Sequence, residues 1–287
     1  MQCDWYQATI NDNIQNVIGI LSNNLGGNLK IAQSGMMGYR KRAFLDDENG
    51  STLSTILWDG RTESQQLPHA FATSENAPDF MNLVRDSWSD SHRVTRIDVC
   101  EDLQGSGLFE EMSAKLQEIA KGKRVKTSVA GDWLTPDSPD GRTLYVGSPS
   151  SPCRVRLYEK GKEVAKKAFH SRGWGTPEGF PIDWVRLELQ CRPSKGVQRE
   201  VSASLPLEEF WGFSAFSLEV ADKVAGMSVP RVKPTKYTKN ADDAVLDFMV
   251  KQYGNVLMRK FKSTGSWEAV GAFLGEIYQG QRKFAAK

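Results

Sequence analysis

Three segments of the chain place ionisable side chains at every second position, which is the spacing of one face of a β-strand. The segments are RIDVCED, RVRLYEKG and WVRLELQ, and apolar residues fill the alternate positions in each. Each is therefore predicted to be a strand with one packing face and one polar face. The polar faces carry Arg96, Asp98, Cys100 and Asp102; Arg154, Arg156, Tyr158 and Lys160; and Trp184, Arg186, Glu188 and Gln190.

Arginines, carboxylates and a tyrosine on one face are the groups that cleavage of a phosphodiester would need. Arginine binds phosphate oxygens in pairs, and carboxylates hold Mg²⁺ or Mn²⁺, which polarises the phosphate. A tyrosine becomes a nucleophile once positive charge favours its phenolate. We assign catalysis to Tyr158 and Lys160, the metal to Asp98, Glu188 and Asp102, and DNA binding to Arg96, Arg154, Arg156 and Arg186.

A structural alternative stands beside each of these assignments. The polar face could be an ordinary solvated sheet surface, with carboxylates and arginines paired across strands. Tyr158 could be a structural or base-stacking residue, and Tyr145 in TLYVGS is a rival nucleophile. Glu159 is a weaker metal candidate, because it points to the other side of an ideal strand unless a bulge intervenes.

Composition excludes several classes of protein and of metal site. The chain has 287 residues, 39% hydrophobic and 25% charged, with a net charge of +2, so any basic surface must be local. The four cysteines form no C-x-x-C pair, and no apolar run is long enough to span a membrane, so we expect reduced thiols in a cytoplasmic protein. Its three scattered histidines leave a metal to carboxylates, which favours a hard cation over zinc.

The elements that must position these residues read as two similar halves. Strand 3–10, helix 11–27, a hairpin of 29–47 with 51–60, and helix 76–90 form the first half. Strand 93–102, helix 108–123 and strands 125–133, 142–148 and 153–161 form the second, and strand 184–191 follows. We therefore predict an α+β fold with a large, mainly antiparallel sheet in two pseudo-repeated halves with packed helices, plus a helical C-terminal region.

The last part of the chain changes character. A helix is predicted over 205–226, and MSVPRVKPTKYTKN then reads as a linker because of its prolines and basic residues. Two amphipathic helices, 242–261 and 266–280, finish the chain. We predict an α+β catalytic domain with nicking and DNA-binding functions at 1–228, a basic linker at 229–240 and a C-terminal helical region at 241–287.

With these elements in place, the chain resembles the Rep_trans family of replication initiation factors, which nick origins of rolling-circle plasmids, filamentous phages and related mobile elements. RIDVCED, TLYVGSPSSPCRVRLYEKGKE and WVRLELQ carry the resemblance in that order, and DWYQATI supports it. It covers residues 4 to 215. The resemblance implies a tyrosine nucleophile, which falls on Tyr158, and acidic metal ligands, which fall on Asp98 and Glu188.

The function implied is initiation of rolling-circle replication by nicking one strand, with a 5′-phosphotyrosyl intermediate and a divalent cation. Implied partners are single-stranded or hairpin origin DNA, host helicase and host polymerase, with a second copy of the chain as a candidate partner and no membrane. Alternatives are a mobilisation relaxase, an origin-binding or promoter-binding protein that no longer cuts, and a metal-dependent nuclease that uses water as its nucleophile.

Overall fold

The structure is a computed structural model that describes residues 1–62, 65–135, 138–172, 181–194, 196–232 and 241–280. The chain divides into two compact units, Met1–Pro234 and Thr235–Lys287. Residues 233–240 of the predicted linker, and residues 281–287 of the predicted C-terminal region, lie outside the described residues.

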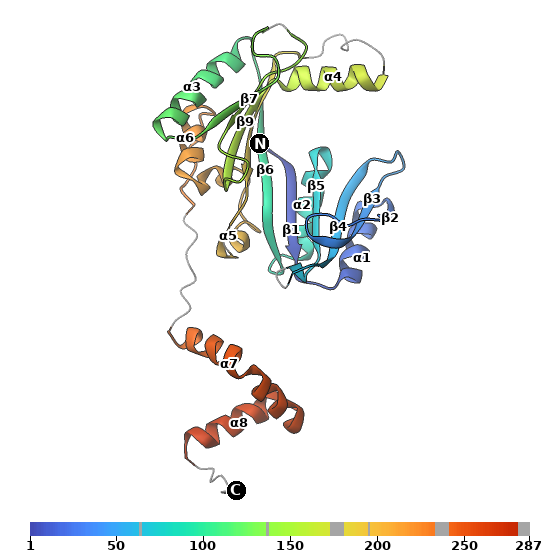
Figure 1. The fold of residues 1–287 in the computed structure, drawn as a ribbon, viewed down its shortest axis with the longest axis vertical. Helices are drawn as coiled ribbons and strands as arrows, with labels where there is room; N and C mark the ends of the chain where they lie inside the picture. The colour runs from blue at the N-terminus through green and yellow to red at the C-terminus, as the bar shows by residue number, and fades with distance from the viewer. Residues whose placement is uncertain (63–64, 136–137, 173–180, 195, 233–240, 281–287) are drawn as a thin grey trace. The chain divides into compact units, whose positions relative to one another are not determined.

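The first unit is built on one ten-stranded sheet, ordered β2-β3-β4-β5-β1-β6-β10-β9-β8-β7, in which neighbouring strands are antiparallel (Figure 1). From the centre outward the strands run β1-β5-β4-β3-β2 on one side and β6-β10-β9-β8-β7 on the other. The two sides share one topology, which confirms the predicted α+β fold in two pseudo-repeated halves. The strands are β1 Gln2–Ile10, β2 Asn28–Ile31, β3 Tyr39–Asp46, β4 Thr52–Gly60, β5 His69–Thr73, β6 His92–Gln104, β7 Thr127–Ala130, β8 Thr143–Val146, β9 Cys153–Tyr158 and β10 Trp184–Cys191.

One hydrophobic core joins both halves on a single face of this sheet. Fully buried Tyr6, Ile97, Leu157 and Leu187 belong to it, although they come from four different strands. In Figure 1 helices α3 and α6 lie together on this side of the second half. The helices of the unit are α1 Ile14–Leu25, η2 Ser74–Asn76, α2 Ala77–Ser87, α3 Leu108–Gly122, α4 Lys160–Arg172, α5 Gly196–Val201, η3 Glu208–Phe213 and α6 Ala215–Lys223.

Local signals set the ends of several helices. The Asn13 side chain accepts a hydrogen bond from the Asn16 backbone N–H at 2.9 Å, and α1 stops at Gly26, whose φ of 75° suits glycine. Ser214 and Ser217 bond reciprocally at the start of α6, which satisfies backbone groups that a helix end leaves open.

The structure corrects the sequence prediction at several places. Residues 29–47 form two strands, β2 and β3, and β5 was not predicted because its five residues lack a clear alternation. Helices α4 and α5 were also missed. Strand β9 ends at Tyr158 rather than at residue 161, because the backbone turns into α4 at Lys160.

The second unit contains the two predicted helices, α7 Ala241–Thr264 and α8 Trp267–Tyr278. Gly265, with φ 82°, allows the turn between them, and the rings of Phe261 and Trp267 stack with centroids 4.9 Å apart. Among the described residues of both units, no helix combines the length and the apolar composition that a membrane span requires.

The core explains which substitutions should unfold the first unit. Leu187→Ala leaves a cavity under the middle of β10, where Leu187 is fully buried, and should lower the free energy of unfolding by about 2–5 kcal/mol. Leu29→Ala is the matched control, since Leu29 is 40% exposed on edge strand β2, and it should cost under about 1 kcal/mol. Urea unfolding measures both; equal losses would contradict this account of the core.

Candidate active site

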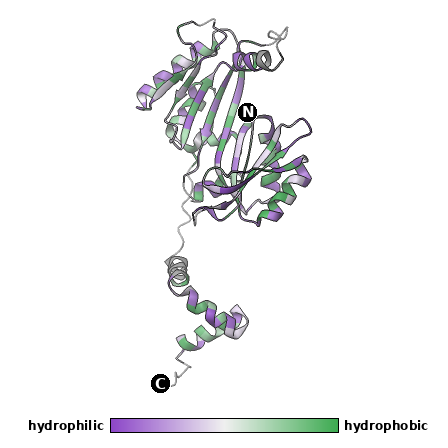
Figure 2. Cartoon of the chain, turned by 45° about the vertical axis from the view of Figure 1, so that its right-hand side comes forward, coloured by the Kyte–Doolittle hydropathy of each residue, from purple (hydrophilic) through white to green (hydrophobic). Residues whose placement is uncertain are grey.

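Strand β9 presents Arg154, Arg156 and Tyr158 on the face opposite the core, while Val155 and Leu157 are fully buried against the helices. The alternation follows from the two-residue repeat of a strand, and Figure 2 shows hydrophobic and hydrophilic residues alternating along the strands. The side chains of Glu188, Arg186 and Gln190 on β10 are buried, so this face is not the solvated surface considered as an alternative.

The three predicted polar strands are neighbours in the sheet, in the order β6-β10-β9. Their register places the polar residues in rows across the sheet. Tyr158, Arg186 and Asp102 form one row, Arg156, Glu188 and Cys100 the next, and Arg154, Gln190 and Asp98 a third. Residues about ninety positions apart in sequence thus become direct neighbours.

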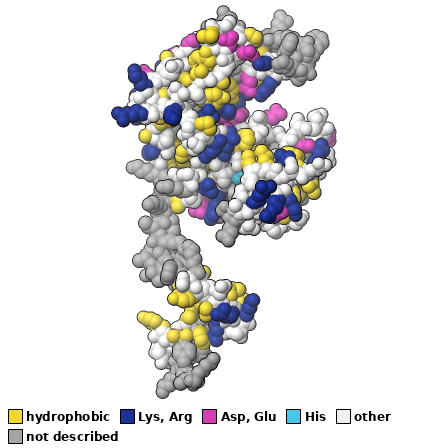
Figure 3. All heavy atoms as spheres, in the orientation of Figure 1, with side chains coloured by type: hydrophobic (Ala, Val, Ile, Leu, Met, Phe, Trp, Pro, Cys, Tyr) yellow, Lys and Arg dark blue, Asp and Glu magenta, His cyan; other side chains and the backbone are white. Residues whose placement is uncertain are grey.

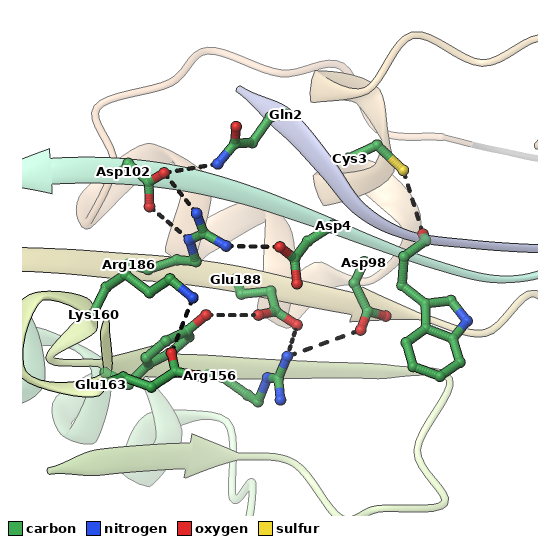
Figure 4. A network of polar contacts seen from close by, with 12 residues as sticks. Gln2, Cys3, Asp4, Asp98, Asp102, Arg156, Lys160, Glu163, Arg186 and Glu188 are labelled. Carbon is green, nitrogen blue, oxygen red and sulfur yellow. Dashed lines mark hydrogen bonds and ion pairs between the residues drawn. The ribbon is translucent and has the colours of Figure 1, made fainter. Parts of the chain in front are cut away.

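Glu188 lies at the centre of this network and is fully buried (Figure 4). Its Oε1 pairs with Nη2 of Arg156, and its Oε2 accepts a hydrogen bond from the Tyr158 hydroxyl at 3.5 Å. One carboxylate therefore contacts both the candidate nucleophile and an arginine.

Asp98 lies beside the same arginine. Its side chain is 1% exposed, and Arg96 donates to it from Nε at 2.9 Å and from Nη2 at 2.5 Å. Nη2 of Arg156 is 4.0 Å from Asp98 Oδ2. The Arg156 guanidinium therefore lies between Asp98 and Glu188, where its charge offsets two carboxylates that could not be buried unpaired.

Arg186 forms hydrogen bonds to two carboxylates, those of Asp102 and Asp4. Its Nε and Nη2 donate to Asp102 at 2.6 and 2.8 Å, and its Nη1 donates to Asp4 at 2.7 Å. Gln2 also donates to Asp102, at 2.7 Å. Arg186 and Asp102 are thus partners of each other in this arrangement, which is the cross-strand pairing that the sequence left open.

Asp4 is a site residue that sequence reasoning missed. Register along β1 passes from Cys3, opposite Val99, to Trp5, opposite Asp98, so Asp4 is the extra residue of a bulge. The bulge turns its carboxylate toward Arg186 (Figure 4). The only sequence signal was the likeness carried by DWYQATI, since alternation alone cannot locate a bulge.

Lys160 and Glu159 lie beyond the end of the strand. Lys160 is the first residue of α4, with Nζ 3.0 Å from Glu163 and 5.7 Å from the centre of the Tyr158 ring. Glu159 bonds to Arg142 at 2.7 to 3.0 Å and to Lys162 at 3.1 Å. Its carboxylate thus contacts groups other than the Asp98 and Glu188 pair.

The rival nucleophile, Tyr145, lies across from Arg156 on β8, and both tyrosines line one cavity of about 340 Å³. The guanidinium of Arg154 stacks over the Tyr145 ring at 4.1 Å. Tyr158 differs in its hydrogen bond to a buried carboxylate, which is a proton acceptor suited to activating a nucleophile.

Burial shifts the pKa values of both Glu188 and Tyr158. Burial raises the pKa of Glu188 to about 7, with the Asp98 charge adding to the rise and Arg156 opposing it. Burial, and then the Glu188 charge, hold the pKa of the Tyr158 hydroxyl well above its usual value, which Arg186 only partly offsets. The expectation that surrounding positive charge favours the phenolate is wrong for the chain without DNA or metal.

The donor set can hold a hard cation only with help from other ligands. Among the described residues, no three His, Cys, Asp or Glu side chains converge closely enough to hold a metal ion. Asp98 and Glu188 offer two buried carboxylates; Arg156 lies beside both, and Arg96 also pairs with Asp98. That fits Mg²⁺ or Mn²⁺, which commonly bind one or two carboxylates and take phosphate oxygens and water as further ligands.

The segment that carries most of these residues is similar to a known protein family. Residues 92–214 match the family model of Rep_trans, described as replication initiation factor. This segment is similar to the Rep_trans family, and it makes up less than half of the 287-residue chain. The Rep_trans segment runs from β6 to the residue before α6 and contains Tyr158, Asp98 and Glu188, whereas Asp4 lies outside it. The resemblance expected from the sequence is confirmed over this segment, whereas residues 4–91 of the expected range lie outside the match.

A solved structure described as "Structure of Rolling Circle Replication Initiator Protein from Geobacillus stearothermophilus" is similar to the chain at 19% sequence identity. Its TM-score is 0.47, and the match covers 81% of this chain and 98% of that chain. No curated protein matches the chain significantly.

The raised pKa of Glu188 predicts a pH dependence of folding in the metal-free protein. Between its ordinary value of 4.5 and about 7, the folded state holds a proton that the unfolded chain releases. This contribution to the free energy of unfolding is therefore present below the lower value and lost as pH rises through the higher one, by on the order of 3 kcal/mol.

Urea unfolding in EDTA across that range should show a smaller fall with pH for Glu188→Gln than for the unsubstituted chain. Glu111→Gln, on the surface of α3, should leave the pH profile unchanged. Parallel profiles for the unsubstituted chain and Glu188→Gln would contradict the shifted pKa.

Proposed function

We propose that this chain initiates rolling-circle replication by nicking one strand of an origin through Tyr158. The observation that carries the proposal is the contact of the Tyr158 hydroxyl with buried Glu188. Tyr158 lines a polar cavity, and both residues lie in the segment that matches Rep_trans. The substrate is DNA with a single-stranded or hairpin segment, because Tyr158 must reach a phosphate that is not enclosed in a duplex.

In the proposed reaction, the Tyr158 oxygen attacks the scissile phosphorus while its proton passes to Glu188. The bond from phosphorus to the 3′-oxygen breaks, the phosphate stays joined to Tyr158 through its 5′ side, and the leaving 3′-oxygen takes a proton. Glu188 suits the first transfer because its Oε2 already accepts a hydrogen bond from the Tyr158 hydroxyl. The 3′-hydroxyl would then prime synthesis by a host polymerase.

Asp98 and Glu188 would hold a Mg²⁺ or Mn²⁺ ion in this proposal. When bound, the ion polarises the phosphate and offsets its charge. Arg156 lies between these carboxylates, so its guanidinium must move to admit the ion and is then available to a phosphate oxygen. Arg186, Asp102 and Asp4 keep β1, β6 and β10 in register around the site.

The nucleophile is tested by adduct formation. The protein is incubated with labelled single-stranded origin DNA and Mn²⁺, and a band resistant to SDS marks the covalent link. Tyr158→Phe should reduce this band below detection, because it removes the attacking oxygen, whereas Tyr145→Phe should keep it. Mapping the DNA-linked peptide identifies the residue directly.

Other products of the same assay would point elsewhere. Free 5′-phosphate ends without adduct indicate a nuclease that uses water, and binding without cutting indicates an origin-binding protein. An equally strong adduct in Tyr158→Phe would refute the assignment of Tyr158.

The cation site is tested by titrating the protein with Mn²⁺ in the absence of DNA. Electron paramagnetic resonance measures how much Mn²⁺ is bound. Asp98→Asn and Glu188→Gln should each weaken binding by about tenfold or more. Arg156→Gln should strengthen it several-fold, because it removes the cation that competes for both carboxylates.

Arg154→Gln is the matched control for that substitution. It removes the same charge from the same strand, and Arg154 forms no ion pair with either carboxylate among the described residues. If Arg156→Gln weakened Mn²⁺ binding, or changed it no more than Arg154→Gln, competition between Arg156 and the metal would be disproved.

A further inference from the structure

We propose that the polar face continues away from Tyr158 as a binding track for single-stranded DNA that flanks the scissile phosphate. The track is an arginine–aromatic track made of Arg96, Arg154, Arg192, Trp5 and Tyr145. It rests on the proposed function, because it would hold the strand that Tyr158 cuts.

The register brings the three arginines together at one end of the polar face. Arg154 is four residues before Tyr158 on the same face of β9. Cys191, the last residue of β10, pairs with Cys153 on β9 and with Ile97 on β6. Continuing this register by one residue places Arg192 between Pro152 and Arg96. The Arg192 backbone N–H donates to Pro152 at 2.6 Å, which continues the pairing.

Charge is distributed unevenly along this face. Around Tyr158, Arg156 and Arg186 are each paired with carboxylates. Within the described part of the chain, Arg154 and Arg192 form no ion pair; the Arg192 side chain donates to the Pro149 carbonyl at 2.6 Å. Figure 3 shows dark blue basic side chains beside magenta acidic ones on the face turned to the viewer. At the far end of the polar face, Arg154 and Arg192 therefore carry positive charge that no ion pair offsets among the described residues, whereas Arg96 is paired with Asp98.

The three arginines also repel one another. Burial, and then the charges of Arg96 and Arg154, hold the pKa of Arg192 below its usual value, although the Asp98 charge opposes them. In addition, the Nε of Arg154 is buried and has no hydrogen-bond partner among the residues that the structure describes. A phosphate placed among these guanidinium groups would relieve the repulsion and accept charge-assisted hydrogen bonds.

Two aromatic rings lie under these arginines. The Arg154 guanidinium stacks over Tyr145 at 4.1 Å, and that of Arg96 stacks over Trp5 at 3.8 Å. Trp5 is itself stacked on Phe71, with centroids 5.4 Å apart and planes within 5°. Both Tyr145 and Trp5 are partly exposed. Basic groups interleaved with aromatic rings are the surface that binds single-stranded nucleic acid without regard to sequence.

The length of the track fits a short stretch of strand. A β-strand rises about 3.3 Å per residue, so Arg154 lies about 13 Å from Tyr158 along β9. A stacked DNA strand advances about 3.4 Å per nucleotide, so about two to four nucleotides reach from the scissile phosphate to the three arginines.

The salt dependence of DNA binding tests the track. Full-length protein is titrated with fluorescein-labelled oligo(dT) in EDTA, which blocks cutting, at several salt concentrations. Arg154→Gln with Arg192→Gln removes two phosphate contacts. The negative slope of log K against log salt should therefore become shallower by about 1.4. Lys115→Gln with Lys121→Gln, on α3 of the helix-covered face, removes the same charge and should leave the slope unchanged.

A second variant separates stacking from charge. Tyr145→Leu keeps all three arginines but removes the ring under Arg154, and should weaken oligo(dT) binding by about fivefold or more with the slope unchanged. Circular dichroism and thermal unfolding establish that each variant is folded. The track is wrong if the arginine pair shows the slope of the unsubstituted chain, or if Tyr145→Leu binds as tightly as that chain.

These outcomes are distinct from failure of the proposed function. Suppose that no covalent adduct forms in the unsubstituted chain, but that the double arginine variant still shows the shallower salt dependence. The track then stands and the nicking reaction fails. If the adduct forms normally and binding is unaffected in both variants, nicking stands and the track fails.

Discussion

The burial of charge on the polar face of β6, β10 and β9 is the constraint on which the rest of the site depends. Glu188 and Asp98 are nearly inaccessible to solvent, and a carboxylate in that position is stable only if it is protonated or paired. Arg156 pairs with Glu188 and lies near Asp98, and the raised pKa of Glu188 shows that pairing does not fully offset burial. The two buried carboxylates therefore each need a bound proton or a neighbouring cation.

This constraint gives the proposed chemistry a physical basis. Glu188 already accepts a hydrogen bond from the hydroxyl that must lose its proton, so it is placed to act as the proton acceptor. In the same proposal these carboxylates would hold a divalent ion, and the guanidinium already beside them would have to move. Proton acceptance, metal binding and movement of Arg156 are thus linked through Glu188.

The duplicated topology explains how the first half contributes to a site carried by the second. Strands β1 and β6 are the central pair of the sheet and are equivalent members of the two halves. Pairing across this junction brings Trp5 next to Asp98, and a bulge turns Asp4 toward Arg186. The family match begins at residue 92, yet the polar network and the proposed track both extend across the junction into β1.

Sequence alone determined which residues share a face, since the two-residue repeat of a strand separates Val155 and Leu157 from Arg154, Arg156 and Tyr158 whatever the fold. It also determined the α+β class and the two halves, because both depend on local patterns. Only the tertiary structure decided that β10 lies between β6 and β9, that a bulge exposes Asp4 to Arg186, and that Arg156 rather than solvent lies beside Glu188. Those facts depend on strand order, register and burial, which are set by contacts between residues distant in the chain and leave no periodic signal in it.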